Sequence, residues 1–344
     1  MGSPFEEDEV DEELRPIPQL FDFDLDRRLS SVLVLEAVVS ESASSAKSLG
    51  TYRVGNAVVI GAEGLMLTIG YLVTEADEVV VTTGDGRKIP AHVLGTDQAT
   101  GFGLIHALEP LNLPPIPIGD SRKLGSETAV VSAGGGGRSH ALSSQAFARA
   151  PFAGYWEYYL EEALFVTPAH PHWSGAALIG PAGDLVGLGS LRMEQLEENG
   201  EVSPLNMFVP AELLPPILDD LARGRPARPP RPWLGVLSRE VSSHVVIWDV
   251  TPGGPAARAE LRHGDVVHAV AGERVSDLGG FYRRIWGARP ARRHRAVDDP
   301  ARERRIRTGS PLRRTAWRCS ANAGSTKPTP AHPGEGRDER SWRG

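Results

Sequence analysis

Short runs of apolar and β-branched residues recur along the first part of the chain, with turns rich in glycine and aspartate between them. The runs cover residues 31–39, 55–60, 65–69, 78–83 and 88–94. Several short strands divided by turn signals are typical of a barrel or a sandwich. The pattern therefore predicts a mostly β fold.

Two further apolar runs directly follow Ser174 and Gly175. They cover residues 176–179 and 185–190 and are divided by a turn, which predicts a β-hairpin. Glycine tolerates the left-handed backbone angles of a tight turn, so Gly175 would let the hydroxyl of Ser174 point outward. Ser174 is therefore a candidate nucleophile, although a serine in an ordinary hairpin turn has the same local sequence.

Changes of composition divide the chain of 344 residues, which is long enough for two or three cores. We expect an acidic, disordered tail over residues 1–28, a β domain over 29–220, and a linker rich in proline and arginine over 221–232. A second, smaller domain is expected over residues 233–287, and a basic tail of low order over 288–344.

Net charge and composition argue against several partners. The formal net charge is −7, which gives no basis for nucleic acid as the main partner. No run of about 18 apolar residues is present, so no membrane helix is expected. The acidic start differs from a secretory signal, and the single Cys319 cannot form an internal disulfide. We therefore expect a cytoplasmic protein, or a periplasmic one if the N-terminus is wrongly assigned.

No cofactor or metal site is predicted. The glycine run at residues 134–137 invites comparison with a phosphate-binding loop. It lacks the following Lys-Ser/Thr pair and the helical pattern that such a loop needs, so we interpret it as an ordinary loop.

The order of the segments resembles that of trypsin-like serine proteases of the HtrA/Deg type. In that family a Leu-Thr-Asn-x-His-Val-Val segment carries the general base, and Thr-Asp-Leu-Ala-Leu-Leu carries the aspartate. The counterparts here are residues 67–73 and 100–105, and the hairpin after Ser174 corresponds to the nucleophile segment. The resemblance implies a trypsin-like double β-barrel over residues 29–220, with Ser174 as the nucleophile.

The resemblance also locates the other site positions. Tyr71 stands at the position of the general base, and Gly101 stands at that of the aspartate. The backbone N–H groups of Ser174 and His172 stand at the oxyanion-hole positions. An unperturbed tyrosine has a pKa of about 10 and is protonated at neutral pH, and glycine has no side chain. The Ser174 hydroxyl therefore lacks the base and the orienting acid that a serine nucleophile needs.

Residues 251–267 and 270–275 resemble a bacterial PDZ domain, in which Gly-Pro-Ala-Ala-x-Ala-Gly-Leu-x-x-Gly-Asp and Val-Asn-Gly are typical. A PDZ domain binds a peptide as an added strand and holds its terminal carboxylate with backbone N–H groups. The implied partners are polypeptides or peptide C-termini. Because HtrA-like proteins are commonly trimers, a homo-oligomer is a further expectation.

The PDZ resemblance implies particular peptide-binding residues. Leu234, Gly235 and Val236 fall on the loop that captures the carboxylate. Residues 278–286 fall on the helix beside the bound peptide, and Phe281 and Ile285 are the expected contacts from that helix.

Two functions remain open at this point. The first is a protein without peptidase activity, or with very weak activity, that binds polypeptides or C-terminal peptides. The alternative is an active serine endopeptidase in which His172 acts as the base for Ser174. His106 is excluded as the base because it lies five strand residues beyond Gly101, about 16 Å at about 3.3 Å per residue.

Residues 288–344 are rich in arginine and proline and lack the apolar alternation of a last PDZ strand. The second domain is therefore expected to lack that strand. Because the change falls inside a domain, it favours a shift of reading frame over a functional tail. A basic tail that binds nucleic acid is the alternative, since arginine clusters bind phosphate. A β-branched strand in another frame directly after Gly287 would confirm the shift.

Overall fold

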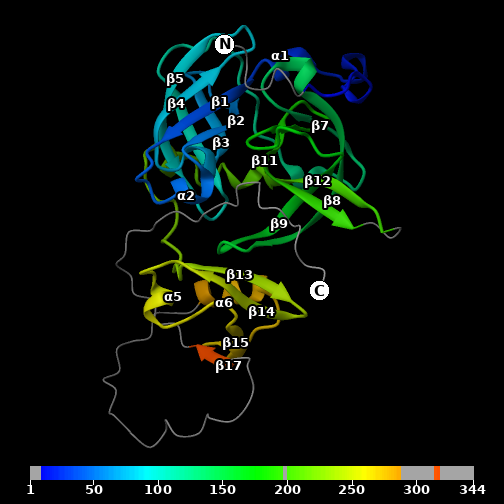
Figure 1. Ribbon diagram of the computed structural model, residues 1–344. Coiled ribbons are helices and arrows are strands. Elements are labelled where there is room, and N and C mark those ends of the chain that lie inside the picture. The colour runs from blue at the N-terminus through cyan, green and yellow to red at the C-terminus, as the bar shows by residue number, and fades with distance from the viewer. Residues whose placement is uncertain (1–8, 197–199, 288–313, 318–344) are drawn as a thin grey trace, which may run out of the picture. The chain divides into compact units, whose positions relative to one another are not determined.

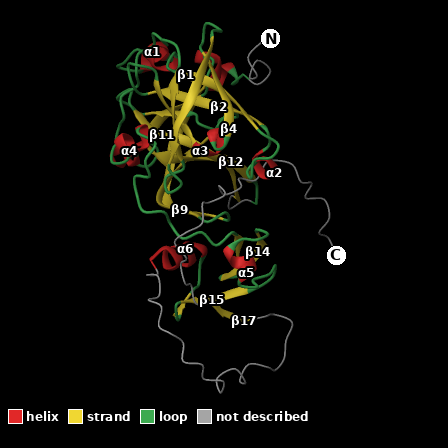
Figure 2. Cartoon of the chain, turned by 90° about the vertical axis from the view of Figure 1, so that its left-hand side faces the viewer, coloured by secondary structure: helices red, strands yellow, loops and turns green. Residues whose placement is uncertain are grey.

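The computed structural model describes residues 9–196, 200–287 and 314–317, and the chain divides into two compact units (Figure 1). The first unit holds the described residues up to 151 together with residues 160–228. The second holds residues 152–159 and the described residues from 229 onward. Strands predominate in both, and the helices are short (Figure 2).

Six antiparallel strands close the first barrel of the first unit. In spatial order they are β1 (Val32–Val39), β2 (Tyr52–Val59), β3 (Leu65–Ile69), β6 (Phe102–Ala107), β5 (Lys88–Thr96) and β4 (Ala76–Thr82). The apolar runs predicted to be strands are confirmed. A single-turn helix, α3 (Gly70–Val73), follows β3 directly and carries Tyr71.

A second six-stranded barrel completes this unit. Its spatial order is β10 (Ala177–Ile179), β11 (Leu185–Leu196), β12 (Val202–Pro210), β9 (Tyr158–Thr167), β8 (Ala141–Gly154) and β7 (Ala129–Ala133). The hairpin predicted after Ser174 is the pair β10–β11. Two closed barrels in succession confirm the predicted double β-barrel.

Short helices connect the strands of this unit. They are η1 (Glu12–Leu14), η2 (Pro18–Leu20), α1 (Leu25–Leu29), α2 (Ala46–Leu49), η3 (Ser121–Lys123), η4 (Gly137–His140), η5 (Ala211–Leu213) and α4 (Leu218–Ala222). Residues 9–28, expected to belong to a tail, instead form three of these helices. Leu25 and Leu29 are buried, and Asp26 forms an ion pair with Arg138. Apolar contact and this ion pair fix a segment whose composition alone favours disorder.

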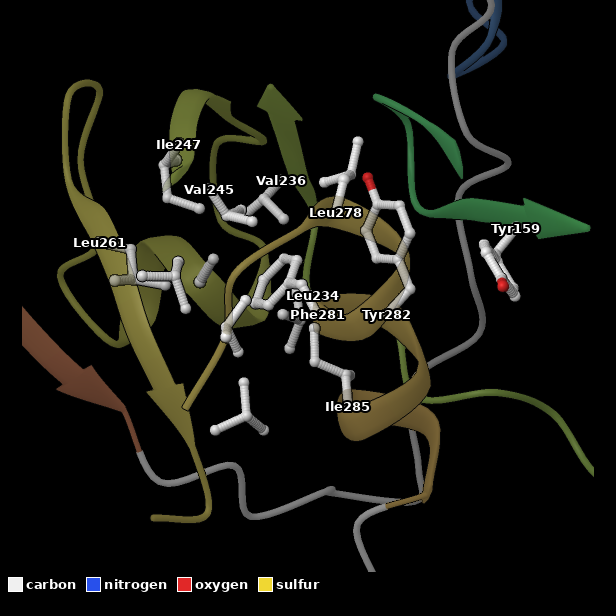
Figure 3. Close-up of a cluster of buried hydrophobic side chains, with 14 residues drawn as sticks. Tyr159, Leu234, Val236, Val245, Ile247, Leu261, Leu278, Phe281, Tyr282 and Ile285 are labelled. Carbon is white, nitrogen blue, oxygen red and sulfur yellow. The ribbon is translucent and has the colours of Figure 1, made fainter. Parts of the chain in front are cut away.

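The second unit is an open sheet covered by helices. Its strands are β13 (Val236–Val241), β14 (His244–Val250), β15 (Val266–Val270) and β16 (Glu273–Arg274), and its helices are α5 (Pro255–Arg258) and α6 (Leu278–Gly287). Phe281 and Ile285 project from α6 into the apolar core (Figure 3).

A further strand comes from the predicted basic tail. Strand β17 (Arg314–Trp317) pairs in parallel with β15, so the sheet gains a strand that the sequence pattern did not predict. Residues 288–313, where the reading-frame hypothesis applies most directly, lie outside the described residues. That hypothesis stays a prediction.

The second unit also contains a piece of a barrel hairpin. Residues 152–159, hereafter the hairpin tip, join the end of β8 to the start of β9 and are grouped with the second unit. Tyr159 from this tip belongs to the same apolar core as Phe281 and Tyr282 (Figure 3). The expected second domain of residues 233–287 did not include this segment.

Candidate functional site

The loop that carries Ser174 is fastened to the first barrel by Asn56 of β2. The Asn56 backbone N–H donates to the Ser174 carbonyl at 2.8 Å, and Nδ2 donates to the carbonyls of His172 and Ser174 at 2.9 Å each. Oδ1 accepts from the Gly135 N–H at 2.8 Å. Sequence reasoning missed Asn56, although an amide inside an otherwise apolar strand run was a usable signal. The glycine run predicted to be a loop thus helps to position the serine.

The turn after Ser174 requires glycine. Gly175 has φ +73°, and a Cβ there would lie 2.1 Å from the Asn56 carbonyl oxygen. Gly189 on β11 is similarly restricted, because its Cβ would lie 2.0 Å from the Trp173 carbonyl oxygen. The tight turn predicted from the Ser-Gly pair is therefore present.

Tyr71 lies at the Ser174 hydroxyl. Its phenolic oxygen is 2.8 Å from Ser174 Oγ and 2.8 Å from the backbone carbonyl of Ser190. A carbonyl can only accept, so the single phenolic proton is donated to Ser190. Ser174 Oγ–H then donates to the phenolic oxygen. Residue 71 thus lies at the hydroxyl of the candidate nucleophile Ser174, as a protonated phenol.

Burial raises the pKa of Tyr71 above its usual value, and the hydrogen bond with Ser174 opposes this shift only in part. The phenol therefore stays neutral at physiological pH and cannot accept the serine proton as a base. Gly101 supplies only backbone, and its carbonyl accepts from the Gly70 N–H at 2.6 Å. Asp97 Oδ2 accepts from the Thr100 N–H at 2.9 Å, which is the turn-capping role expected of an aspartate in a turn.

The predicted oxyanion hole is altered by a buried histidine. The His172 N–H donates to Nδ1 of His170 at 3.0 Å, and His170 Nε2 donates to the His140 carbonyl at 3.0 Å. A backbone N–H can only donate, which fixes this tautomer. Burial lowers the pKa of His170 to about 4, so the ring is neutral. The second predicted oxyanion donor thus already has a partner.

The other histidines take different places. The His172 ring lies 5.8 Å from that of His140 and 6.0 Å from that of His170, centre to centre. His106 pairs with His92 across the strands β5 and β6 of the first barrel, with the ring centres 5.7 Å apart.

The loop predicted to capture a peptide carboxylate lies in the second unit. The backbone N–H groups of Leu234, Gly235 and Val236 converge on one carboxylate, the side chain of Glu157 in the hairpin tip. Phe281 and Ile285, expected to contact a peptide, are 1% and 0% exposed and belong to the core. Sequence reasoning did not identify Glu157, because nothing in the local sequence links it to a loop so far along the chain.

Within the described ranges, no cluster of three or more His, Cys, Asp or Glu side chains could hold a metal ion. In the same part of the chain, no helix is long and apolar enough to cross a membrane.

Comparison with known families defines the class of protein. Residues 55–188 match the trypsin-like peptidase domain, and residues 232–295 match the PDZ domain. The chain is therefore a trypsin-like peptidase domain followed by a PDZ domain. In this combination of domains, and by the relatives described next, the chain is similar to HtrA-type serine proteases with a PDZ domain.

Two curated relatives illustrate the similarity. The chain is 27% identical over 252 residues to a "Probable periplasmic serine endoprotease DegP-like" of Halomonas elongata, covering 69% of this chain and 51% of the relative. It is 24% identical over 259 residues to "Serine endoprotease DegS" of Salmonella typhimurium, covering 71% and 72%. The chain thus spans about half the length of the DegP-like relative.

A solved structure shows the same fold. An AlgW variant, an HtrA-type protease with a tripeptide, has a TM-score of 0.50 and 21% identity, covering 78% of this chain and 88% of that one.

The expected cytoplasmic location is contradicted by these relatives. The Halomonas elongata protein and similar proteins of Pseudomonas putida are named periplasmic. The acidic first residues and the lone cysteine were therefore a poor guide to location.

Proposed function

We propose that this chain is an HtrA-type protein with little or no peptidase activity that binds polypeptides through its PDZ domain. The observation that carries the proposal is the hydrogen bond from Ser174 Oγ to Tyr71, whose only proton is donated to the Ser190 carbonyl. A serine hydroxyl needs a base to take its proton, and a neutral phenol with a raised pKa does not take it.

Two further features support low activity. Gly101 offers no carboxylate to orient a base, and the His172 N–H already donates to His170. Removing a catalytic triad lowers turnover by about a millionfold, and the residual rate depends on an intact oxyanion hole. Both contributions are weakened here.

Peptidase activity is the competing function, and the names of the relatives as endoproteases favour it. In that case His172 would act as the base for Ser174. A fluorophosphonate probe, with casein as an unfolded substrate, separates the two. We expect no labelling and no cleavage above the level of Ser174→Ala. Cleavage that is lost in Ser174→Ala and weakened in His172→Ala would contradict our proposal.

Peptide capture is supported by the three N–H groups of Leu234, Gly235 and Val236, which already converge on a carboxylate. Peptides with a free apolar C-terminus should therefore bind, and the same peptides as C-terminal amides should not. Equal binding of both forms in fluorescence polarisation would contradict capture of the terminal carboxylate. From the relatives we further propose a periplasmic location, which cell fractionation tests.

A further inference from the structure

The hairpin tip is an aromatic turn with one carboxylate at its end. Four of its aromatic rings contact one another, and those of Trp156 and Tyr158 are stacked at 5.7 Å with an angle of 8°. Glu157 has φ +60°, a left-handed conformation that non-glycine residues rarely adopt. This backbone conformation fixes the direction of the Glu157 side chain, and it costs some conformational energy.

The Glu157 carboxylate lies on the loop predicted to hold the terminus of a peptide. Oε1 accepts from Gly235 N–H at 2.7 Å and from Val236 N–H at 3.1 Å, and Oε2 accepts from Leu234 N–H at 2.9 Å. Hydrogen bonds to an ionised carboxylate are about twice as strong as neutral ones. Converging backbone N–H groups form an anion site, and here a side chain fills it.

The backbone of the tip also binds as a peptide would. Ser238 N–H on β13 donates to the Tyr155 carbonyl at 2.8 Å, two residues before Glu157. On the side of α6, the Tyr282 hydroxyl donates to the Gly154 carbonyl at 2.8 Å and accepts from the Glu157 N–H at 3.1 Å. The tip is therefore bonded both to the strand and to the helix that border a PDZ peptide site.

Side-chain contacts complete this arrangement. Tyr159 is 7% exposed within the core of the second unit (Figure 3). A Cβ on Gly279 of α6 would lie 2.8 Å from the Tyr159 ring. The glycine therefore leaves room for this ring against the helix. The guanidinium of Arg239 lies 5.9 Å from the centre of the Tyr155 ring.

We propose that the hairpin tip is a built-in ligand of the PDZ peptide site, with the Glu157 carboxylate in place of a terminal carboxylate. The inference rests on the proposed capture of peptides by this site and specifies what the site recognises: an acidic side chain at the end of an aromatic turn. A peptide with a free C-terminus binds only after the tip leaves. Its apparent affinity is therefore its intrinsic affinity multiplied by the fraction of molecules in which the site is open.

The test uses the full chain and the substitution Glu157→Gln, which keeps the size of the side chain and removes its charge. Hydrogen–deuterium exchange at the amides of Leu234, Gly235 and Val236 reports occupancy without any added ligand. Glu162→Gln is the matched control, because Glu162 lies on the same hairpin and pairs with Arg149 instead. Tyr282→Phe is a second variant, which removes only the hydroxyl bonds to Gly154 and Glu157.

Two fluorescent probes are added in polarisation measurements. One is an octapeptide ending in a free valine, and the other is a cyclised peptide with the sequence of residues 151–160. We expect Glu157→Gln to speed exchange at the three amides and to tighten probe binding by roughly tenfold to a hundredfold, and Glu162→Gln to change neither. Tyr282→Phe should act in the same direction and more weakly.

The outcomes separate this inference from the proposed function. Unchanged amide exchange in Glu157→Gln overturns the inference, whatever the valine peptide does. Faster exchange with tighter binding of the valine peptide supports both. Faster exchange with binding of the cyclised peptide alone supports the built-in ligand and contradicts capture of free C-termini. Faster exchange with binding of neither probe overturns recognition of an acidic aromatic turn.

Discussion

Replacing Asn56 with alanine should loosen the Ser174 loop and destabilise the double barrel. The side chain is fully buried and makes three hydrogen bonds to backbone groups of His172, Ser174 and Gly135. Alanine keeps the backbone bond to the Ser174 carbonyl and removes these three. The substitution therefore isolates the contribution of one amide to the geometry of the loop.

The magnitude follows from the number of bonds lost. At about 0.5–1.5 kcal/mol for each of the three net hydrogen bonds, the loss is about 1.5–4.5 kcal/mol. A domain of this size unfolds in urea with a slope of about 2–3 kcal/mol per molar. The midpoint of the transition should therefore fall by about 0.5–2 M.

The measurement is urea unfolding of the full chain, followed by circular dichroism in the range dominated by the barrel strands. Gln145→Ala serves as the control, because Gln145 is an exposed amide on β8 and its loss should change the free energy of unfolding by less than about 0.5 kcal/mol. A shift below about 0.3 M for Asn56→Ala would refute the assigned role.

Three other predictions concern the same loop. Tyr71→His combined with Gly101→Asp should make Ser174 react with a fluorophosphonate faster than in the unmodified protein; an unchanged rate would mean that the missing base does not limit reactivity. Gly175→Ala should lower the melting temperature by several degrees, because its φ is +73° and its Cβ would overlap the Asn56 carbonyl. Burial lowers the pKa of His170 from 6.5 to about 4, so the unfolded chain binds the extra proton and stability should fall by about 3 kcal/mol as the pH drops from 7 to 4. His170→Gln should flatten that dependence in unfolding measured at each pH, and an unchanged profile would contradict it.

The strands and the serine turn were predictable because their signals are local. The apolar run over residues 65–69 and the left-handed glycine after Ser174 each depend on a few neighbouring residues. The resemblance also indicated which side chain meets Ser174, and Tyr71 does so. The local pattern could not predict which group accepts the phenolic proton of Tyr71. The acceptor is the Ser190 carbonyl, which is far along the chain.

Contacts over long sequence distances account for the remaining differences. Leu25 and Leu29 are buried, although their segment is acidic and was expected to be disordered. Glu157 finds its N–H partners at residues 234–236, and no periodicity relates the two segments. Such pairs depend on tertiary packing, which overrides the local composition.

The second unit is assembled from two separate stretches of the chain, which the ribosome makes at different times. The tip emerges from the ribosome long before β13 and α6, which bind it. At a synthesis rate of about 5–20 residues per second, its aromatic side chains stay without their partners for several seconds. During that interval the tip of one nascent chain can enter the completed PDZ site of a neighbour. We therefore expect synthesis of this protein at high local concentration to yield domain-swapped dimers. In these dimers the hairpin tip of each chain makes with the other chain the hydrogen bonds that it makes within a single chain.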